Sequence, residues 1–335
     1  MKLLVTGGAG FIGSNFIRYW VQNHPLDSII NLDLLTYAGN PENLKDIDTH
    51  PHYEFVHGDI CDRALVDSVV KKVDIIVHFA AETHVDRSIL DPAPFIRTNI
   101  MGTYTLLESA LKNGNKRFHH ISTDEVFGSL SLKSSEKFTL NTPYNPRSPY
   151  SASKASSDHL VRSYGITFGL PITISNCSNN FGPFQFPEKL IPLAISHFLE
   201  KKAVPIYGDG KYVRDWLFVE DHCEAIDCII QKGTQGETYL VGGLTEDISN
   251  LEIIEKIAQI MHTQNLTTHV SDRPGHDRRY AIDWSSTQAL GWKPRHSFEE
   301  ALIKTVEWYT KHKSWWKRVI SGEYQQYYKK QYGSS

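Results

Sequence analysis

Short apolar runs rich in β-branched residues alternate with longer amphipathic stretches through the first half of the chain. The short runs predict strands at residues 2–6, 28–33, 53–57, 74–79, 117–122 and 172–176. The amphipathic stretches predict helices near residues 11–23, 62–72, 94–113 and 149–168. Because strands that alternate with helices form a parallel sheet covered on both faces, the pattern predicts an α/β fold with a doubly wound sheet.

The pattern changes after about residue 180. Segment 180–220 is rich in proline, glycine and aromatic residues, and helical patterns return near residues 221–231, 250–263 and 297–312. We therefore expect residues 1–180 to form the sheet domain and residues 181–335 to form a smaller C-terminal α/β lobe. We expect the chain to return to the main sheet around residues 220–245.

The composition narrows the class of protein. The 335 residues suffice for two lobes, and a net charge of −3 gives no general basic surface for nucleic acid. The four cysteines form no CxxC pair, so neither disulfides nor a metal site are expected; they are Cys61, Cys177, Cys223 and Cys228. No apolar run reaches membrane-spanning length, and the N-terminus runs into a strand without a signal peptide, so we expect a cytoplasmic protein.

A glycine-rich turn follows the first predicted strand. Gly7, Gly10 and Gly13 lie between that strand and a helix, with Phe11 and Ile12 in the same turn. Such a turn lets the backbone approach a pyrophosphate at a helix N-terminus, which predicts a Rossmann-type dinucleotide site. The second strand ends in Asp33, where an acid binds a ribose hydroxyl, and no arginine follows it, so NAD is favoured over NADP.

The next two strand ends carry weaker signals. The third runs into Asp59-Ile60, where an acid can reach the adenine amino group, and the fourth ends in Phe79-Ala80-Ala81, where small residues let a cofactor lie against the backbone. Ala80 and Ala81 are equally well explained as packing residues.

Tyr150 and Lys154 lie one helical turn apart on one face of the helix predicted at 149–168. A nearby ammonium favours the phenolate and lowers the pKa of tyrosine, which makes it a base for a hydroxyl proton. A tyrosine packed on a lysine stem is the alternative. The glycine turn, the acid after the second strand and this pair together resemble the extended short-chain dehydrogenase/reductase family, whose members oxidise nucleotide sugars at carbon 4 with bound NAD.

The stretch STDEVFG at residues 122–128 indicates the branch of that family. Thr123-Asp124-Glu125 resembles the dTDP-glucose 4,6-dehydratases, and the similarity extends over LLTYAGN (34–40), AAETHVDRSI (80–89), YSASKASSDHL (150–160), NCSNNFGPFQFPEKLIPL (176–193), RDWLFVEDH (214–222) and DRPGHDRRYAID (272–283). Phe127 and Phe181 stand where this family usually has tyrosine.

The resemblance implies an acid–base division. A ketone at carbon 4 acidifies the proton on carbon 5, which Glu125 removes, while Asp124 gives a proton to the leaving hydroxyl of carbon 6, and the hydride returns to carbon 6. Thr123 holds the carbon 4 hydroxyl beside Tyr150. Two neighbouring carboxyls with separated pKa values suit this division. A solvated turn is the alternative interpretation of the same residues.

The resemblance also implies the remaining contacts and a homodimer. Further NAD contacts are expected at Leu34, Leu35, Thr36, Thr98 and Asn180. Nucleotide-sugar contacts are expected at Thr83, Asn179, Lys189, Leu190, Pro205, Ile206, Tyr207, Arg214, Asn250, Asp272, Arg273 and His276. The dimer is expected to form through the helices at 94–113 and 149–168.

Several alternatives stay open. Taken singly, Arg214 is better explained as a surface ion-pair residue, with Asp215 or Glu220 as its partner. Residues 272–279 are equally well explained as a charged loop, and a capped structural histidine is the alternative for His84. The aromatic and basic residues at 314–318 and 323–332 suit a helix docked on the lobe better than nucleic-acid stacking. For the reaction, the rivals are a UDP-glucose 4,6-dehydratase, a 4-epimerase, which needs neither acid, and a non-catalytic NAD-sensing protein.

Overall fold

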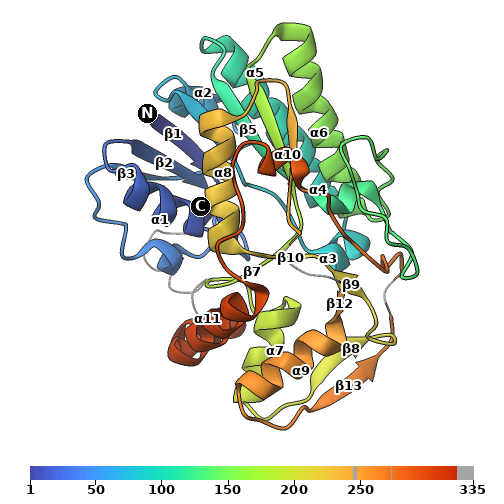
Figure 1. Cartoon of the computed structure of the whole chain (residues 1–335). Helices are drawn as coiled ribbons and strands as arrows, with labels where there is room; N and C mark the ends of the chain where they lie inside the picture. Colours follow the sequence, from blue (N-terminus) through green and yellow to red (C-terminus); the bar gives the residue numbers. More distant parts are fainter. Residues whose placement is uncertain (244–246, 273, 323–335) are drawn as a thin grey trace.

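The computed structural model describes residues 1–243, 247–272 and 274–322 (Figure 1). Its main element is a parallel seven-stranded sheet in the order β11-β6-β5-β4-β1-β2-β3. The strands are β1 (Lys2–Thr6), β2 (Ser28–Asp33), β3 (Tyr53–His57), β4 (Ile75–His78), β5 (Arg117–Thr123), β6 (Ile172–Cys177) and β11 (Thr238–Val241). The order reverses beside β1, as in doubly wound folds, so the predicted α/β class is confirmed.

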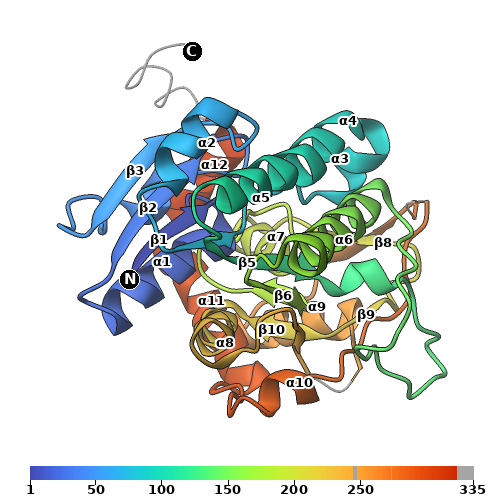
Figure 2. The ribbon, with the colours of Figure 1, turned by 90° about the horizontal axis from the view of Figure 1, so that it is seen from above.

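Helices cover both faces of this sheet, and the alternation of side chains along the strands decides which face each residue contacts. Leu4, Ile30 and Ile76 pack against one layer of helices, while their neighbours Leu3 and Ile29 pack against the other. The first layer is α2 (Arg63–Val70), α5 (Thr103–Lys112) and α6 (Pro149–Phe168); the second is α1 (Phe11–Asn23) and α8 (Val219–Lys232). Figure 2 shows α5 and α6 on the side opposite α8.

Helix α6 has clear sequence signals at both ends. Ser148 and Ser151 form a reciprocal capping box, Pro149 occupies the first turn, and Gly169 ends the helix with a left-handed backbone conformation (φ 66°). These signals fix where the helix begins, and therefore which turns carry Tyr150 and Lys154.

The helix predicted at 94–113 is interrupted. It consists of α4 (Ala93–Phe95), a π-helical segment η2 (Ile96–Gly102) and α5. Within this segment the Asn99 amide donates to the Glu82 carbonyl (3.0 Å) and to Ser153 Oγ (2.8 Å), and Asn99 Oδ1 accepts from the Glu82 backbone N–H (2.9 Å). Wide helical turns of this kind are frequent at functional sites, and here the turn brings Thr98 to the cleft described below.

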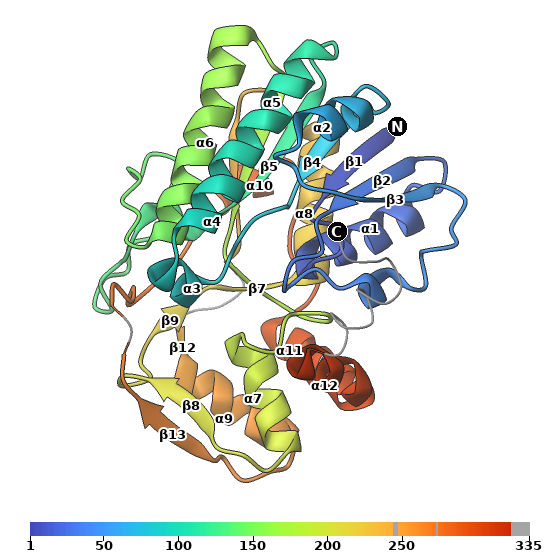
Figure 3. The same cartoon turned by 180° about the vertical axis from the view of Figure 1, so that it is seen from behind.

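A second lobe lies beyond the carboxyl ends of the strands (Figure 3). Its core contains Phe181, Ile195, Ile254 and Leu302. Its strands form two-stranded sheets and its helices pack around them; these elements are β7 (Asn179–Phe181), α7 (Leu190–Leu199), β8 (Val204–Tyr207), β9 (Val213–Arg214), β10 (Trp216–Phe218), β12 (Ile248–Ser249), α9 (Asn250–Ile260), β13 (Thr267–Val270), α11 (Phe298–Lys311) and α12 (Lys313–Ser321). The short elements α3 (Val85–Leu90), α10 (Ser285–Gln288), η1 (Pro41–Leu44) and η3 (Asp124–Phe127) complete the described fold.

Helix α12 carries the aromatic residues predicted to dock. Trp315 and Trp316 are buried, and the Trp315 indole donates to Asn43 Oδ1 (3.0 Å). The docking interpretation of residues 314–318 is therefore confirmed, while residues 323–332 lie outside the described part of the chain. Among the helices described in residues 1–243, 247–272 and 274–322, none combines the length and apolar character that a membrane crossing requires.

Candidate active site

A deep cleft opens at the carboxyl ends of β1 to β6, where parallel strands of doubly wound sheets bind their ligands. The glycine turn forms its floor. A Cβ on Gly7 would lie 2.7 Å from the backbone of Ala80, and a Cβ on Gly13 would lie 2.4 Å from the Gly7 carbonyl oxygen. Gly7 also has φ +72°, a conformation that favours glycine. The turn therefore leaves backbone exposed at the N-terminus of α1, which fits a dinucleotide pyrophosphate.

Asp33 lies at the end of β2 and lines the same cleft. Its carboxylate accepts from the backbone N–H of Ala9 (2.9 Å) and of Leu35 (2.8 Å). Burial raises the pKa of Asp33, and the two backbone hydrogen bonds oppose that rise. The carboxylate is thus held in a fixed orientation, with lone pairs left for a ribose hydroxyl.

The cleft gathers nearly all the residues expected to bind NAD. These are Gly7, Gly10, Phe11, Ile12, Gly13, Asp33, Leu34, Thr36, Asp59, Ile60, Phe79, Ala80, Ala81, Thr98, Tyr150, Lys154 and Asn180. Leu35 is the exception: it has a positive φ of 54° and is not among the lining residues.

Other lining residues were not singled out from the sequence. They include Tyr37, Gly39, Glu82, Cys177, Ser178, Gln185 and Glu188. Tyr37 has the Arg87 guanidinium 3.7 Å from its ring centroid. Tyr37 lies within the LLTYAGN segment at residues 34–40, which the resemblance to the family includes.

Tyr150 and Lys154 are both buried and point into the cleft from α6. Lys154 Nζ donates to the Ile121 carbonyl (2.7 Å), which attaches the helix to β5. Burial lowers the pKa of Lys154 to about 8, although Asp158 opposes the change. Burial and the Glu125 charge raise the pKa of Tyr150 well above its ordinary value, and a hydrogen bond with Thr123 opposes that rise. The expected lowering of the tyrosine pKa is therefore wrong for the chain alone, in which desolvation by burial is the largest cause of the shift.

The paired acids follow directly on β5. Thr123 is the N-cap residue of η3, and its hydroxyl accepts from the Glu125 backbone N–H (3.3 Å). Asp124 is only 1% exposed, while Glu125 is half-buried. Burial and the Glu125 charge raise the pKa of Asp124 well above its ordinary value. The solvated-turn interpretation is therefore wrong, and the raised pKa makes Asp124 the better proton donor of the two acids.

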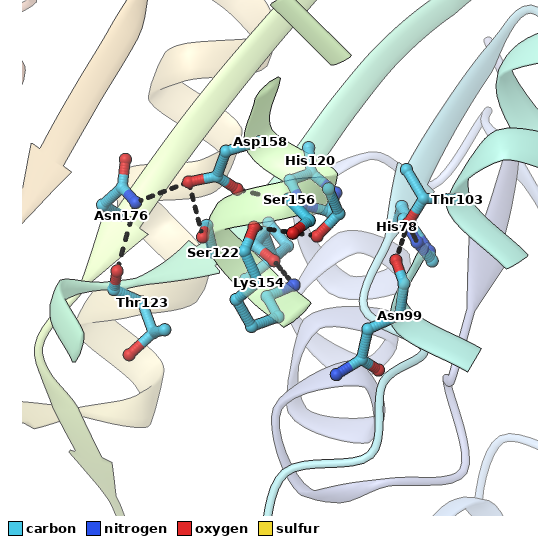
Figure 4. Close-up of polar contacts among 12 residues, drawn as sticks. His78, Asn99, Thr103, His120, Ser122, Thr123, Lys154, Ser156, Asp158 and Asn176 are labelled. Atoms are coloured by element: carbon cyan, nitrogen blue, oxygen red, sulfur yellow. Dashed lines mark hydrogen bonds and ion pairs between the residues drawn. The ribbon is translucent and has the colours of Figure 1, made fainter. Parts of the chain in front are cut away.

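A buried polar network joins helix α6, which carries Tyr150 and Lys154, to the end of β5, which the paired acids follow (Figure 4). Asp158 lies on α6 one turn after Lys154 and is 0% exposed. Its Oδ2 accepts from Ser122 Oγ (2.9 Å), Tyr144 Oη (2.7 Å) and Asn176 Nδ2 (3.1 Å). Asn176 also donates to the Thr123 carbonyl (3.1 Å). These buried hydrogen bonds fix α6 relative to the end of β5, while Asp158 Oδ1 and Asn176 Oδ1 have no hydrogen-bond partner in the described structure.

His120 on β5 also lies beside Asp158. Its Nε2 lies 3.3 Å from Asp158 Oδ1, and both side chains are fully buried. Burial lowers the pKa of His120 to about 4, so the imidazole is neutral at pH 7. The His120 imidazole therefore gives the Asp158 carboxylate no positive charge to pair with.

The second lobe contributes Lys189 to the cleft and Tyr207 near it. Lys189 lines the cleft with Thr83 and Asn179, and its Nζ donates to the Thr83 carbonyl (3.4 Å). Tyr207 Oη donates to Asp86 Oδ2 (3.2 Å), which links β8 to α3. Leu190 begins α7, and Pro205 and Ile206 belong to β8.

We call the part of the second lobe from Lys189 to His276 the rim. Four more of the expected nucleotide-sugar contacts belong to it: Arg214, Asn250, Asp272 and His276. The His276 ring stacks on Tyr212 at 3.6 Å between centroids and its Nδ1 lies 2.7 Å from Asp272 Oδ1. Asn250 begins α9, two residues after Ile248, which pairs with Arg214. None of these side chains is among the residues that line the cleft itself. Arg273 lies outside the described residues.

Arg214 and His84 decide two of the open alternatives. Arg214 is buried, donates to the carbonyls of Val213 (2.7 Å) and Asp277 (2.9 Å), and lies 4.4 Å from the Tyr280 ring centroid. The surface ion-pair interpretation of Arg214 is therefore wrong. His84 Nδ1 accepts from the Arg87 backbone N–H (3.3 Å) as the cap of α3, so its structural interpretation is confirmed.

Both unusual phenylalanines lie in apolar clusters. Phe127 packs against Phe138 and Tyr144, each at 5.2 Å between centroids, and Phe181 is 0% exposed among Trp216, Phe218 and Phe298. A phenol at either position would need a buried hydrogen-bond partner, so these surroundings suit the phenylalanine ring.

Comparison with known proteins gives a consistent family. A family model described as GDP-mannose 4,6 dehydratase matches residues 4–305. The chain is 50% identical to dTDP-glucose 4,6-dehydratase from Escherichia coli, with 97% of this chain and 98% of that protein covered. Two solved dTDP-glucose 4,6-dehydratases are similar in structure. One, from Bacillus anthracis in complex with NAD, has a TM-score of 0.89 at 47% identity, with 95% of this chain and 99% of the other covered.

The second solved protein, from Streptomyces venezuelae with NAD and TYD bound, has a TM-score of 0.92 at 45% identity and covers 95% of this chain and 100% of its own. The family match spans the cleft, the Tyr150–Lys154 pair and the acids after β5. The chain therefore belongs to the GDP-mannose 4,6 dehydratase family of NAD-dependent short-chain dehydrogenase/reductase enzymes.

Proposed function

We propose that the protein converts dTDP-glucose to dTDP-4-keto-6-deoxyglucose and water, which makes it a dTDP-glucose 4,6-dehydratase. The observation that carries this proposal is the acid pair, with Asp124 buried and Glu125 half-buried, next to Thr123 and the Tyr150–Lys154 pair. Relatives of that activity align with this chain from end to end.

Each side chain of the cluster has a place in this reaction. Tyr150 takes the proton of the carbon 4 hydroxyl, which Thr123 holds. Glu125 then removes the proton of carbon 5 and later returns it to the same carbon. Asp124 gives its proton to the carbon 6 hydroxyl, which leaves as water. The raised pKa of Asp124 suits the acid of this pair.

The cleft fits NAD, because the exposed backbone of the glycine turn and the carboxylate of Asp33 match a pyrophosphate and a ribose. When bound, NAD supplies the acceptor for the hydride of carbon 4 and its donor to carbon 6, and the positive charge of its oxidised ring favours the Tyr150 phenolate. Gly7, Gly10, Gly13, Asp33, Asp59 and Thr98 would hold it, and Tyr150 and Lys154 line the same cleft.

The rim of the second lobe would hold the nucleotide. Lys189 and Arg214 supply positive charge, Tyr207 and His276 offer aromatic rings, and Asn250 has a buried Oδ1 with no hydrogen-bond partner in the described structure. Cations and unpaired polar groups around aromatic faces suit a nucleoside diphosphate.

Mass spectrometry of purified protein tests the proposal. The protein is incubated separately with dTDP-glucose, UDP-glucose and GDP-mannose without added NAD. Loss of one water from dTDP-glucose alone is expected. Loss of water from UDP-glucose instead would show that the protein prefers the uracil nucleotide. No mass change with any of the three sugar nucleotides would favour an epimerase, whose product has the same mass, or a non-catalytic role.

We also propose a homodimer that forms through η2, α5 and α6. Apolar side chains are exposed on these helices and on their ends: Ile96, Met101, Ile166 and Phe168. Light scattering coupled to size exclusion should give twice the mass of the chain, and a monomer mass would contradict the proposal.

We further propose a cytoplasmic location, because the four cysteines are unpaired thiols. Two domains, 1–180 with the return at 220–245 and 181–335, account for the separate cores on the sheet and in the second lobe.

A further inference from the structure

The proposed reaction leaves a proton imbalance within the active site. The carbon 4 hydroxyl gives its proton to Tyr150, and the carbon 6 hydroxyl leaves as water with a proton from Asp124. Glu125 takes a proton from carbon 5 and returns it, so it ends unchanged. After one turnover Tyr150 holds one proton more than before, and Asp124 holds one fewer. One proton must therefore move from Tyr150 to Asp124, directly or through solvent, before the next turnover.

Both groups are shielded from bulk water. Tyr150 is 7% exposed and Asp124 is 1% exposed. Asp124 Oδ2 is buried and has no hydrogen-bond partner in the described structure. Since bulk water has little access to either group, a side chain inside the protein is the better carrier for this proton.

The Thr123 hydroxyl lies between the two groups. It donates to Asp124 Oδ1 (3.3 Å) and accepts from the Glu125 backbone N–H (3.3 Å). It lines the cleft together with Tyr150, and its interaction with the phenol opposes the rise in the Tyr150 pKa. A hydroxyl has one donor and two acceptor positions. Thr123 can therefore accept from Glu125 and from Tyr150 while it donates to Asp124, which uses all three positions.

The backbone of Thr123 is fixed in this position. Its carbonyl accepts from Asn176 Nδ2 (3.1 Å), and Asn176 donates in turn to the buried Asp158 carboxylate (Figure 4). The hydroxyl can rotate between Tyr150 and Asp124 while the strand end that carries it stays in place.

We propose that the Thr123 hydroxyl returns the proton from Tyr150 to Asp124 after each turnover. The Tyr150 O–H bond breaks as its proton passes to Thr123 Oγ1, and the original Thr123 proton forms the new O–H bond on the Asp124 carboxylate. The step restores the phenolate and the carboxylic acid, and no electrons are transferred. Rotation of the hydroxyl then returns its donor to Tyr150. The proposal rests on the proposed function and adds a second role for Thr123 in it.

Rapid-quench measurements on NAD-loaded protein test this role. The variants are Thr123→Val, which keeps the shape and removes the hydroxyl, and Thr123→Ser, which keeps the hydroxyl. With dTDP-glucose in excess, wild type and Thr123→Ser should form product linearly from the first turnover. Thr123→Val loses the contact with the carbon 4 hydroxyl, so its first turnover should already be slower than that of wild type. After about one product per site its rate should fall at least about a further tenfold, because Asp124 is not reprotonated.

The ultraviolet absorbance of ionised tyrosine gives a second readout in single-turnover runs. In Thr123→Val it should recover more slowly than product appears. Recovery that keeps pace with product, together with no burst, would overturn the proposal. A burst in Thr123→Ser would also overturn it, because that variant retains the hydroxyl. A wild-type protein that removes no water from dTDP-glucose would instead refute the proposed function, and the wild-type run shows this separately.

Discussion

The two sides of the cleft are held in different ways. The sheet side comprises the strand ends from Gly7 to Cys177 together with α6, and the lobe side comprises the rim from Lys189 to His276. On the sheet side Asp158 is 0% exposed and accepts three hydrogen bonds, whereas on the lobe side Tyr207 is 41% exposed and reaches Asp86 with one. Buried networks fix geometry, while exposed polar pairs contribute little. We infer that the sheet side determines rate and cofactor retention, and the lobe side determines substrate affinity.

The largest effect should come from Tyr150→Phe on the sheet side. Loss of the phenol removes the base for the carbon 4 hydroxyl, so the rate of product formation should fall by about 10³-fold or more. Stopped-flow absorbance of the nicotinamide should show no reduction when sugar nucleotide is added. Full activity would remove Tyr150 from its proposed role.

The second-largest effect should come from a steric clash at the glycine turn. In Gly7→Ala the new Cβ would lie 2.7 Å from the Ala80 backbone, so the turn must shift and NAD should be lost during purification. Gly169→Ala is the matched control, because Gly169 has a similar φ of +66° and no atom within 4 Å of the new Cβ. Cofactor content is measured by absorbance of the denatured protein. Equal retention in both variants would contradict the role given to the close approach of Gly7 to the Ala80 backbone.

The Asp158 network should affect the pH profile. The pKa of Lys154 is about 8, so activity that needs the ammonium is present below that pH and falls as the pH rises through it. Asp158 raises this pKa, so Asp158→Asn should move the alkaline limb of kcat to lower pH and reduce kcat about tenfold at pH 8. Tyr144→Phe removes one hydrogen bond and keeps the charge, so its limb should stay in place. An unmoved limb in Asp158→Asn would contradict the role.

The smallest effect should come from the lobe side. Tyr207→Phe loses the hydrogen bond to Asp86, which is worth about 1 kcal/mol, so KM should rise by roughly fivefold while kcat stays unchanged. Steady-state kinetics separate the two constants. A fall in kcat of similar size would show that the lobe side also sets the rate.

The sheet side was also the more predictable from sequence. The glycine turn, Asp33 and the Tyr150–Lys154 spacing are local patterns, because each depends on residues within one turn or one helix. The alternation of strands and helices fixed the order of elements in the same local way. Burial of Asp124, which separates an acid from a solvated turn, was visible only in the structure.

The structural features that the sequence does not predict depend on contacts between residues far apart in the chain. Strand β8 pairs with β13, more than fifty residues later in the chain, and Asp158 gathers donors from β5, β6 and the loop at Tyr144. The π-helical turn at Asn99 depends on Glu82 and Ser153 in the same way. No local pattern encodes such contacts. The pKa of Tyr150 was misjudged for a related reason, since desolvation depends on the whole fold.

The acid pair provides the most direct test of the central claim, which is that the sheet side removes water from an oxidised sugar. Asp124→Asn and Glu125→Gln are incubated with dTDP-glucose, and mass spectrometry of the sugar is combined with absorbance of the nicotinamide. We expect both variants to reduce the nicotinamide and to accumulate sugar that has not lost water, whereas wild type loses it. Normal water loss in both variants would contradict the account.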